Sequence, residues 1–182
     1  PSINSSSQLA IKKYPYYLFP AKLTHENKSL VEKMMLSEDL DRMSHHLEIQ
    51  QGIIYSGQPK EDVFADYVKD STFKPILDGR DVNRWMINWD VKKYDKYLSY
   101  TSKLHRPREE RLFVSNKKIL FPRRATKIMA TIDTDKYYAL NTAYICLMNK
   151  NIYVIEYLLA ILNSKLIEYI YNQLFMGWQI TI

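Results

Sequence analysis

Residues 117–148, KKILFPRRATKIMATIDTDKYYALNTAYICLM, combine strand-forming side chains with a cluster of cations. Within this stretch the side chains over 118–124 alternate with period 2, which predicts a half-buried strand. A second run covers 128–132, and a third, 137–148, is rich in Tyr, Ile, Thr and Leu, which suit a pleated surface. The residues 133–136, Asp-Thr-Asp-Lys, have turn chemistry. The sequence therefore predicts a β-meander of three strands.

Cations gather at the connection between the first two of these strands. Arg123, Arg124 and Lys127 lie there, and a rigid sheet would hold them at one edge for an anionic partner. The wider segment 103–127 holds nine cations and two anions, a net charge of +7. Because the whole chain carries +6, the remainder sums to −1. Such a basic block either faces a polyanion or is a solvated surface, and both interpretations stay open here.

Helices are expected on both sides of this sheet. Thr24 can cap a helix over about 25–36. The segment 153–176 is apolar over much of its circumference, which predicts one long, largely buried helix, with a partner-facing helix as the alternative. The apolar run 157–162 is much too short for a membrane span. The chain is therefore expected to be an α+β domain, with a mixed β-sheet and a long C-terminal helix.

The 182 residues are expected to form one main domain, because their composition is that of an ordinary globular protein. Residues 1–24 read as a leader and extended arm, and 25–182 as a single domain. The chain has no initiator Met and no signal peptide, and we expect it to be a piece of a longer protein. Its single cysteine, Cys146, lies in an apolar run, which predicts a buried, inert thiol and suits a cytoplasmic location. Because the apolar run 157–162 is too short to span a bilayer, no membrane partner is expected.

Sequence motifs for catalysis or for metal and nucleotide binding are missing. The four histidines and Cys146 show no metal-ligand spacing, and no GxGxxG, Walker or GxSxG motif occurs. Carboxylate pairs occur at Asp62 with Asp66 and at Asp133 with Asp135, where local hydrogen bonding is the expected role. We therefore expect no catalytic residue, no metal site and no cofactor site in this chain.

The sequence also predicts the local structure around Asp81 and the ion pairs of three arginines. Asp81 can cap a single helical turn that ends at Trp85, with a strand over 85–89 after it. Arginines flanked by carboxylates in the sequence are expected to pair with them locally. These pairings are Arg80 and Arg84 with Asp78 and Asp81, and Arg111 with Glu110.

Taken in order, several short motifs resemble a known family. They are Gly52-Ile53 with Gly57, LDGRDVNRW (77–85), LHRPREERLF (104–113), KKILFPRR (117–124), DKYYALNT (135–142) and YLLAILNSKL (157–166). Over about 40–175 the chain resembles the TaqI-like C-terminal specificity domain of type IIG restriction-modification proteins and related adenine-N6 DNA methyltransferases.

The resemblance implies that this chain recognises a double-stranded DNA target and performs no chemistry itself. In such proteins a preceding methyltransferase domain binds S-adenosylmethionine and flips out an adenine, and some also carry a nuclease. That methyltransferase domain would be the second partner of this chain.

The residue chemistry favours the same partner, because Lys and Arg neutralise phosphates. The residues expected at the DNA face are Arg106, Arg108, Arg123, Arg124 and Lys127, with Lys117 and Lys118 as phosphate contacts. Four polar residues of the motifs are expected to be structural, because Asn and Ser satisfy backbone groups at strand and helix junctions. They are Asn141, Thr142, Asn163 and Ser164.

Two other functions remain as alternatives. The helix 153–176 could dock a protein partner, in which case the basic block is only a solvated face. Asp90 and Lys92 resemble the end of a nuclease metal motif, although such a short pattern arises often by chance.

Overall fold

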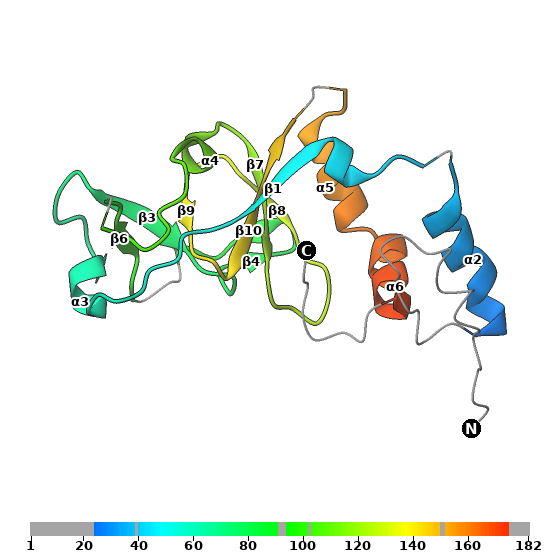
Figure 1. Ribbon diagram of the computed structural model, residues 1–182, viewed down its shortest axis with the longest axis horizontal. Coiled ribbons are helices and arrows are strands. Elements are labelled where there is room, and N and C mark those ends of the chain that lie inside the picture. The colour runs from blue at the N-terminus through cyan, green and yellow to red at the C-terminus, as the bar shows by residue number, and fades with distance from the viewer. Residues whose placement is uncertain (1–23, 39, 91–93, 102, 150–151, 175–182) are drawn as a thin grey trace.

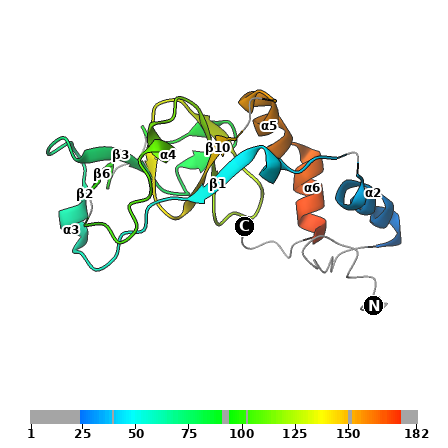
Figure 2. The same cartoon turned by 45° about the horizontal axis from the view of Figure 1, so that its top comes forward.

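The computed structural model of the protein describes residues 24–38, 40–90, 94–101, 103–149 and 152–174. The molecule is elongated, with two small sheets in the middle and at one end, and helices at the other (Figure 1). The rotated view in Figure 2 shows the same succession, from α3 and β2 through β1 and β10 to α5, α6 and α2. Helices and a mixed set of strands confirm the α+β class.

The first sheet lies at the centre of the molecule and is antiparallel throughout. Its strand order is β1 (Leu47–Gln51), β10 (Ala143–Met148), β7 (Lys118–Pro122) and β8 (Thr131–Asp133). Strand β7 is thus an inner strand, bonded to β10 on one side and to β8 on the other.

The second sheet lies toward the α3 end and mixes strand directions. Its order is β2 (Phe64–Ala65), β6 (Tyr97–Ser99), β3 (Phe73–Leu77) and β9 (Tyr138–Ala139). The β3–β9 pair is parallel and the other pairs are antiparallel.

The described helices are short, and most of them lie beside the sheets. They are α2 (His25–Leu36), the 3-10 turn η2 (Met43–His45), α3 (Lys60–Val63), α4 (Arg111–Val114), α5 (Ile155–Leu162) and α6 (Lys165–Leu174). Over the described part of the chain, none of them has the length and apolar character needed to cross a membrane.

The predicted meander is divided between the two sheets. Strands β7 and β8 pair as neighbours, as expected. The third predicted strand, 137–148, is broken by a turn at Leu140–Thr142, where the Ala143 amide donates to the Leu140 carbonyl at 2.9 Å. Its first part, β9, joins β3 in the second sheet, and its second part, β10, joins β7. This turn therefore links the two sheets.

Strand β7 is buried on both faces, so the prediction of a half-buried strand is wrong. Ile119 and Phe121 belong to a core that includes Leu158 of α5, whereas Leu120 belongs to the core shared with the second sheet. A strand between two cores needs apolar side chains in both directions, which its near-continuous apolar sequence supplies. The cations Arg123 and Arg124 follow only where the strand ends.

The C-terminal helical region is present, but it consists of two helices rather than one. Asn163 separates α5 from α6 and is buried. Its side-chain Nδ2 donates to the Ala130 carbonyl at 2.8 Å, and its Oδ1 accepts from the Ala130 amide at 2.9 Å. The Ser164 hydroxyl then accepts from the Ile167 amide at 3.2 Å and caps α6. The structural role expected for Asn163 and Ser164 is confirmed.

Helix α2 extends the helical end of the molecule by packing on α6. Thr24 caps it as expected, through a reciprocal capping box with Asn27. Val31 is fully buried against Ile170 and Leu174 of α6. The predicted leader and arm, 1–24, lie outside the described residues except for Thr24 itself.

The segment around Asp81 forms a hairpin, which corrects the predicted helical turn and strand 85–89. Its strands are β4 (Val82–Asn83) and β5 (Met86–Ile87). The Asp81 carboxylate does not cap a helix but accepts from the Asp78 amide at 2.8 Å, closing the turn before β4. Trp85, at the hairpin tip, has a positive φ of 70°, which a helical turn would not allow.

Candidate nucleic-acid interface

Two glycines, Gly52 and Gly79, pack against the backbone of residues 139–142, where the two sheets join. A Cβ on Gly52 would lie 2.3 Å from the Ala139 carbonyl oxygen, and one on Gly79 would lie 2.3 Å from the Thr142 carbonyl oxygen. The Thr142 hydroxyl accepts from the Gly79 amide at 2.9 Å. Only glycine permits these backbone approaches. The structural role expected for Thr142 is confirmed, and the junction forms a rigid floor.

A groove of about 920 Å³ opens over this floor. Leu140, Asn141 and Thr142 line it from the junction, and Val82 and Asn83 line it from β4. Its size is that of a ligand pocket, but its lining is unusually rich in charge. The charged lining residues are Lys60, Asp78, Arg80, Asp95, Arg123 and Arg124.

The two carboxylates of the groove already have partners. Asp78 accepts from the Arg80 guanidinium at 2.9 Å, as predicted, and Asp95 pairs with Lys60 at 2.5 Å. Among the described residues, no carboxylate pairs with the other two cations of the groove, which are Arg123 and Arg124. These two arginines are therefore the charges that remain for an external anion.

Arg123 and Arg124 begin the β7–β8 loop, residues 123–130, which also carries Lys127. Arg124 and Lys127 are exposed, and Arg123 is half-buried. The Arg123 amide donates to the Thr142 carbonyl at 2.8 Å and ties the start of the loop to the junction. The structure thus brings together three of the predicted DNA-face residues on one connection.

The far end of this loop is held by two other elements. The Ala130 amide donates to Asn163 Oδ1, and the Ala130 carbonyl accepts both from Asn163 Nδ2 and from the Trp85 amide, the latter at 3.0 Å. Arg84 donates to the Ile128 carbonyl at 3.0 Å and pairs with Glu168 of α6 at 2.8 Å. The expected pairing of Arg84 with a local carboxylate is therefore replaced by one across the fold.

Arg106 and Arg108 do not line the groove. Arg106 is exposed, and its backbone exchanges hydrogen bonds with Ile54 at 3.0 and 3.1 Å. Arg108 is half-buried and has a φ of 67°, and its Nε donates to the Gly52 carbonyl at 3.3 Å. The Tyr100 hydroxyl donates to the Arg108 carbonyl at 2.8 Å. These contacts give Arg108 a structural role, and neither Arg106 nor Arg108 lines the groove with Arg123 and Arg124.

Lys117 and Lys118 differ although they are adjacent. Lys117 is exposed and pairs with Glu156 of α5 at 2.5 Å. Lys118 is fully buried, where its ammonium group pairs with Asp133 at 2.5 Å and donates to the Phe113 carbonyl at 2.6 Å. Burial lowers the pKa of Lys118, against the opposing effect of Asp133. Lys118 cannot reach a phosphate from this position, so its predicted role as a phosphate contact is corrected to a structural one.

Arg111 pairs with different carboxylates from the one expected. Its guanidinium bonds to both oxygens of Glu48 at 2.7 and 2.9 Å, and its Nε donates to Glu109 at 2.6 Å. Glu110 instead accepts from the Tyr138 hydroxyl at 2.7 Å. The hydrogen bonds that Glu48 accepts from Arg111 hold the pKa of the Glu48 carboxyl below its ordinary value.

The described residues contain no group of three or more metal-ligating side chains. Asp133 accepts from the amides of Asp135 and Tyr137 at 2.8 and 2.9 Å, which is the local role expected for it. Cys146 is fully buried, and burial raises the pKa of its thiol, so it has the inert position expected. The nuclease alternative is based on Asp90 and Lys92. Asp90 is exposed, and Lys92 lies outside the described residues.

Two groove cations were missed when the DNA face was predicted. Arg80 was expected to pair with Asp78, and it does, but its side chain is 91 % exposed and also lines the groove. Its position directly after the Asp78–Gly79 turn was the available signal. Lys60 has no comparable signal, because nothing in its surrounding sequence marks it as a neighbour of the junction.

Residues 74–179 match the family model described as the TaqI-like C-terminal specificity domain. The match covers more than half of the chain. The chain belongs to this family. TaqI-like specificity domains serve sequence-specific DNA recognition in restriction-modification systems, and a specificity domain is not itself catalytic. No curated protein matches the sequence.

Proposed function

We propose that this specificity domain selects the DNA target of a restriction-modification enzyme, with the β7–β8 loop and the adjoining groove as its DNA face. The proposal is supported by which charged side chains of the groove are paired within the protein. Both groove carboxylates are paired within the protein, while Arg123 and Arg124 have no carboxylate partner among the described residues. Cations in this state are available to neutralise phosphates.

Within this face, Arg123, Arg124 and Lys127 are the proposed phosphate contacts. Asn83 and Asn141 line the same groove, and a side-chain amide is the group that suits an adenine edge, so we propose them as base contacts. For Asn141 this goes beyond the structural role expected from the sequence. Phosphate contacts position a protein on DNA, and base contacts give the specificity. Arg106 and the exposed Lys117 remain proposals at the margin of this face.

The parent enzyme is proposed to methylate adenine at N6, with or without an endonuclease activity. Its methyltransferase domain would bind S-adenosylmethionine and be the second partner of this chain. We also propose that the parent enzyme acts in the cytoplasm, where its DNA substrate would be present. Methylation of a plasmid by the parent enzyme, in the presence of S-adenosylmethionine, tests this part of the proposal.

The DNA face is tested by the salt dependence of binding. We expect Arg123→Ala with Arg124→Ala to weaken binding to duplex DNA and to reduce the slope of log affinity against log salt by about 2. Fluorescence anisotropy with a labelled duplex over a range of salt concentrations measures both quantities.

The matched control removes the same two charges elsewhere. Arg111→Ala with Lys33→Ala changes the net charge equally, but Arg111 is paired with Glu48, and Lys33 is an exposed residue of α2 that does not line the groove. We expect the slope to stay close to that of the wild type. Equal losses in the two double variants would show that only net charge matters and would exclude the groove as the DNA face.

A protein-interaction role is the second candidate function, favoured by the exposed side chains of the C-terminal helices. Tyr157 of α5 and Leu166 and Tyr169 of α6 are 52, 43 and 39 % exposed. Light scattering and duplex retention at low salt separate the two functions. Tight self-association without DNA retention would favour the protein-interaction role.

A further inference from the structure

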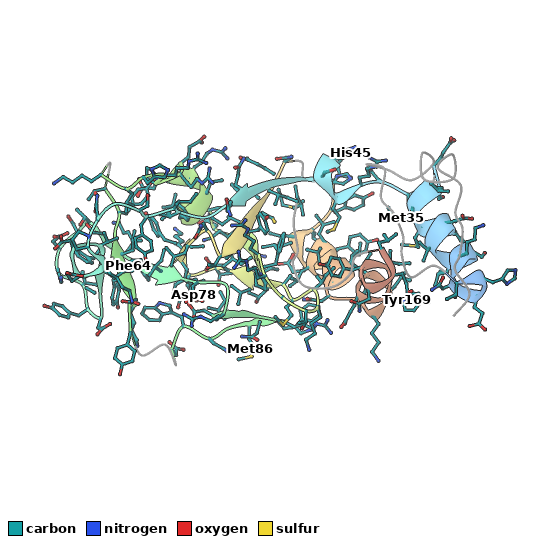
Figure 3. All side chains as sticks on the ribbon, turned by 60° about the horizontal axis from the view of Figure 1, so that its bottom comes forward. Met35, His45, Phe64, Asp78, Met86 and Tyr169 are labelled. Atoms are coloured by element: carbon teal, nitrogen blue, oxygen red, sulfur yellow. The ribbon has the colours of Figure 1, made fainter. Side chains whose placement is uncertain are left out.

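The tip of the β4–β5 hairpin exposes two large apolar side chains. Trp85 and Met86 are 56 and 54 % exposed. Figure 3 shows Met86 at the outer edge of the molecule, away from the cores. Burying such side chains is favourable, so two adjacent ones at a turn form a small apolar surface that is available to a partner.

The backbone at this tip is strained. Trp85 has a φ of 70°, in the left-handed region that bulky side chains rarely adopt. A glycine at this position would remove the strain, because it has no Cβ. Such strain persists only where the surrounding structure enforces it, and it concentrates at functional sites.

The surrounding contacts that enforce this geometry come from the basic loop. The Trp85 amide donates to the Ala130 carbonyl at 3.0 Å, and Arg84 donates to the Ile128 carbonyl at 3.0 Å. β4 also lies against β7, and β5 against β8. The apolar tip and the cationic loop therefore form one rigid unit rather than two independent connections.

The charge of this unit favours a polyanion as its partner. Residues 82–87 and 123–130 together contain four cations and no carboxylate. One of them, Arg84, is paired with Glu168. The other three are the loop cations Arg123, Arg124 and Lys127, which have no carboxylate partner among the described residues. An aromatic and a flexible thioether on the same unit as these cations match a nucleic acid, which offers apolar base faces between phosphates.

We propose that Trp85 and Met86 enter a groove of duplex DNA and contact its bases, while the cations of the 123–130 loop contact the flanking phosphates. This inference rests on the proposed function and extends it, because it adds an apolar contact from a different element. Base contacts by the tip would contribute to sequence discrimination, which phosphate contacts do not.

The decisive variant is Trp85→Gly, which removes the indole and suits the positive φ. We expect its thermal midpoint to equal or exceed that of the wild type, so loss of folding does not confuse the result. The probe is a pool of short random-sequence duplexes, enriched by retention on the wild-type chain. We expect the affinity of Trp85→Gly for this pool to fall about tenfold, with the salt slope unchanged because no phosphate contact is lost.

A second measurement follows the indole directly. Saturation with the enriched pool should quench part of the tryptophan emission of the wild type, because stacking on bases changes the surroundings of Trp85. The emission of Trp85→Gly should change less, since its remaining described tryptophan, Trp89, is half-buried and packs against Tyr97 and Tyr137. Tyr157→Ala, at an aromatic of α5 that is 52 % exposed and does not line the groove, is the matched control for affinity.

The outcomes separate this inference from the proposed function. Wild-type affinity and wild-type quenching in Trp85→Gly, together with weakened binding by Arg123→Ala with Arg124→Ala, would overturn the inference and leave the function in place. If the wild-type chain retains no duplex at low salt, the proposed function fails first. Loss of self-association in Trp85→Gly without loss of DNA affinity would assign the tip to a protein contact and overturn the inference.

Discussion

The two halves of the basic region, residues 103–118 and the loop 123–130, use their cations differently. In the first half, three of the six cations pair with a carboxylate, namely Arg111, Lys117 and Lys118, and Lys118 does so inside the core. In the loop, none of the three cations pairs with a carboxylate of the described residues. The comparison shows that the charge of a sequence segment locates a basic region, whereas pairing in the fold decides which of its charges are available.

The largest expected effect tests the internal role of the first half. We expect Lys118→Ala to lower the free energy of unfolding by about 3–5 kcal/mol, because it leaves the buried Asp133 carboxylate unpaired. Urea denaturation measures the loss. Lys117→Ala is the matched control, and its exposed pair with Glu156 should contribute less than about 1 kcal/mol. Equal small losses in both variants would contradict the division of roles.

An intermediate effect is expected where the loop is anchored. Asn163→Ala removes both hydrogen bonds to Ala130 and leaves a buried amide without its partner. We expect a loss of about 2–3 kcal/mol in unfolding free energy and weaker DNA binding, because the end of the loop is released. Asn149→Ala, at an exposed asparagine after β10, is the control. Full stability in Asn163→Ala would show that the loop is held by the hairpin contacts alone.

The smallest effect concerns pH and the pairing of Arg111 with Glu48. The pKa of Glu48 is lowered in the folded protein, so the pair contributes stability that is present above the unfolded pKa of about 4.3 and is lost as the pH falls through the folded value. Arg111→Gln should therefore destabilise the protein slightly at pH 7, and the difference from wild type should vanish in acid. Urea denaturation from pH 7 to acid measures it. A difference that grows in acid would contradict this sign.

Local sequence patterns predicted the features whose partners are close in the chain. Thr24 caps α2 through a residue three positions away, and Asp78 pairs with Arg80 two positions away. The turn after β8 depends on the Asp133 carboxylate and the amides that follow it. Such contacts need only the short-range geometry of the backbone, which residue type largely determines.

Features that depend on distant partners could not be predicted in this way. Arg84 pairs with Glu168, 84 positions later, instead of a neighbouring carboxylate. The helix predicted over 153–176 breaks at Asn163 because that side chain bonds to Ala130, 33 positions earlier. Hydrophobic periodicity describes one element at a time, so it carries no information about a polar group that another element must satisfy.

The sequence alone determined that this protein is an α+β domain with a cationic connection after the strand at 118–122, because residue propensity and charge are local properties. The order of its motifs also indicated its family. Only the tertiary structure decided which cations face outward. Lys118 and Arg124 have the same sign and lie six positions apart, but one is paired across β7 and β8 inside the core and the other lines an open groove. The physical reason is that burial and pairing depend on which strands become neighbours, and strand pairing is a property of the whole fold.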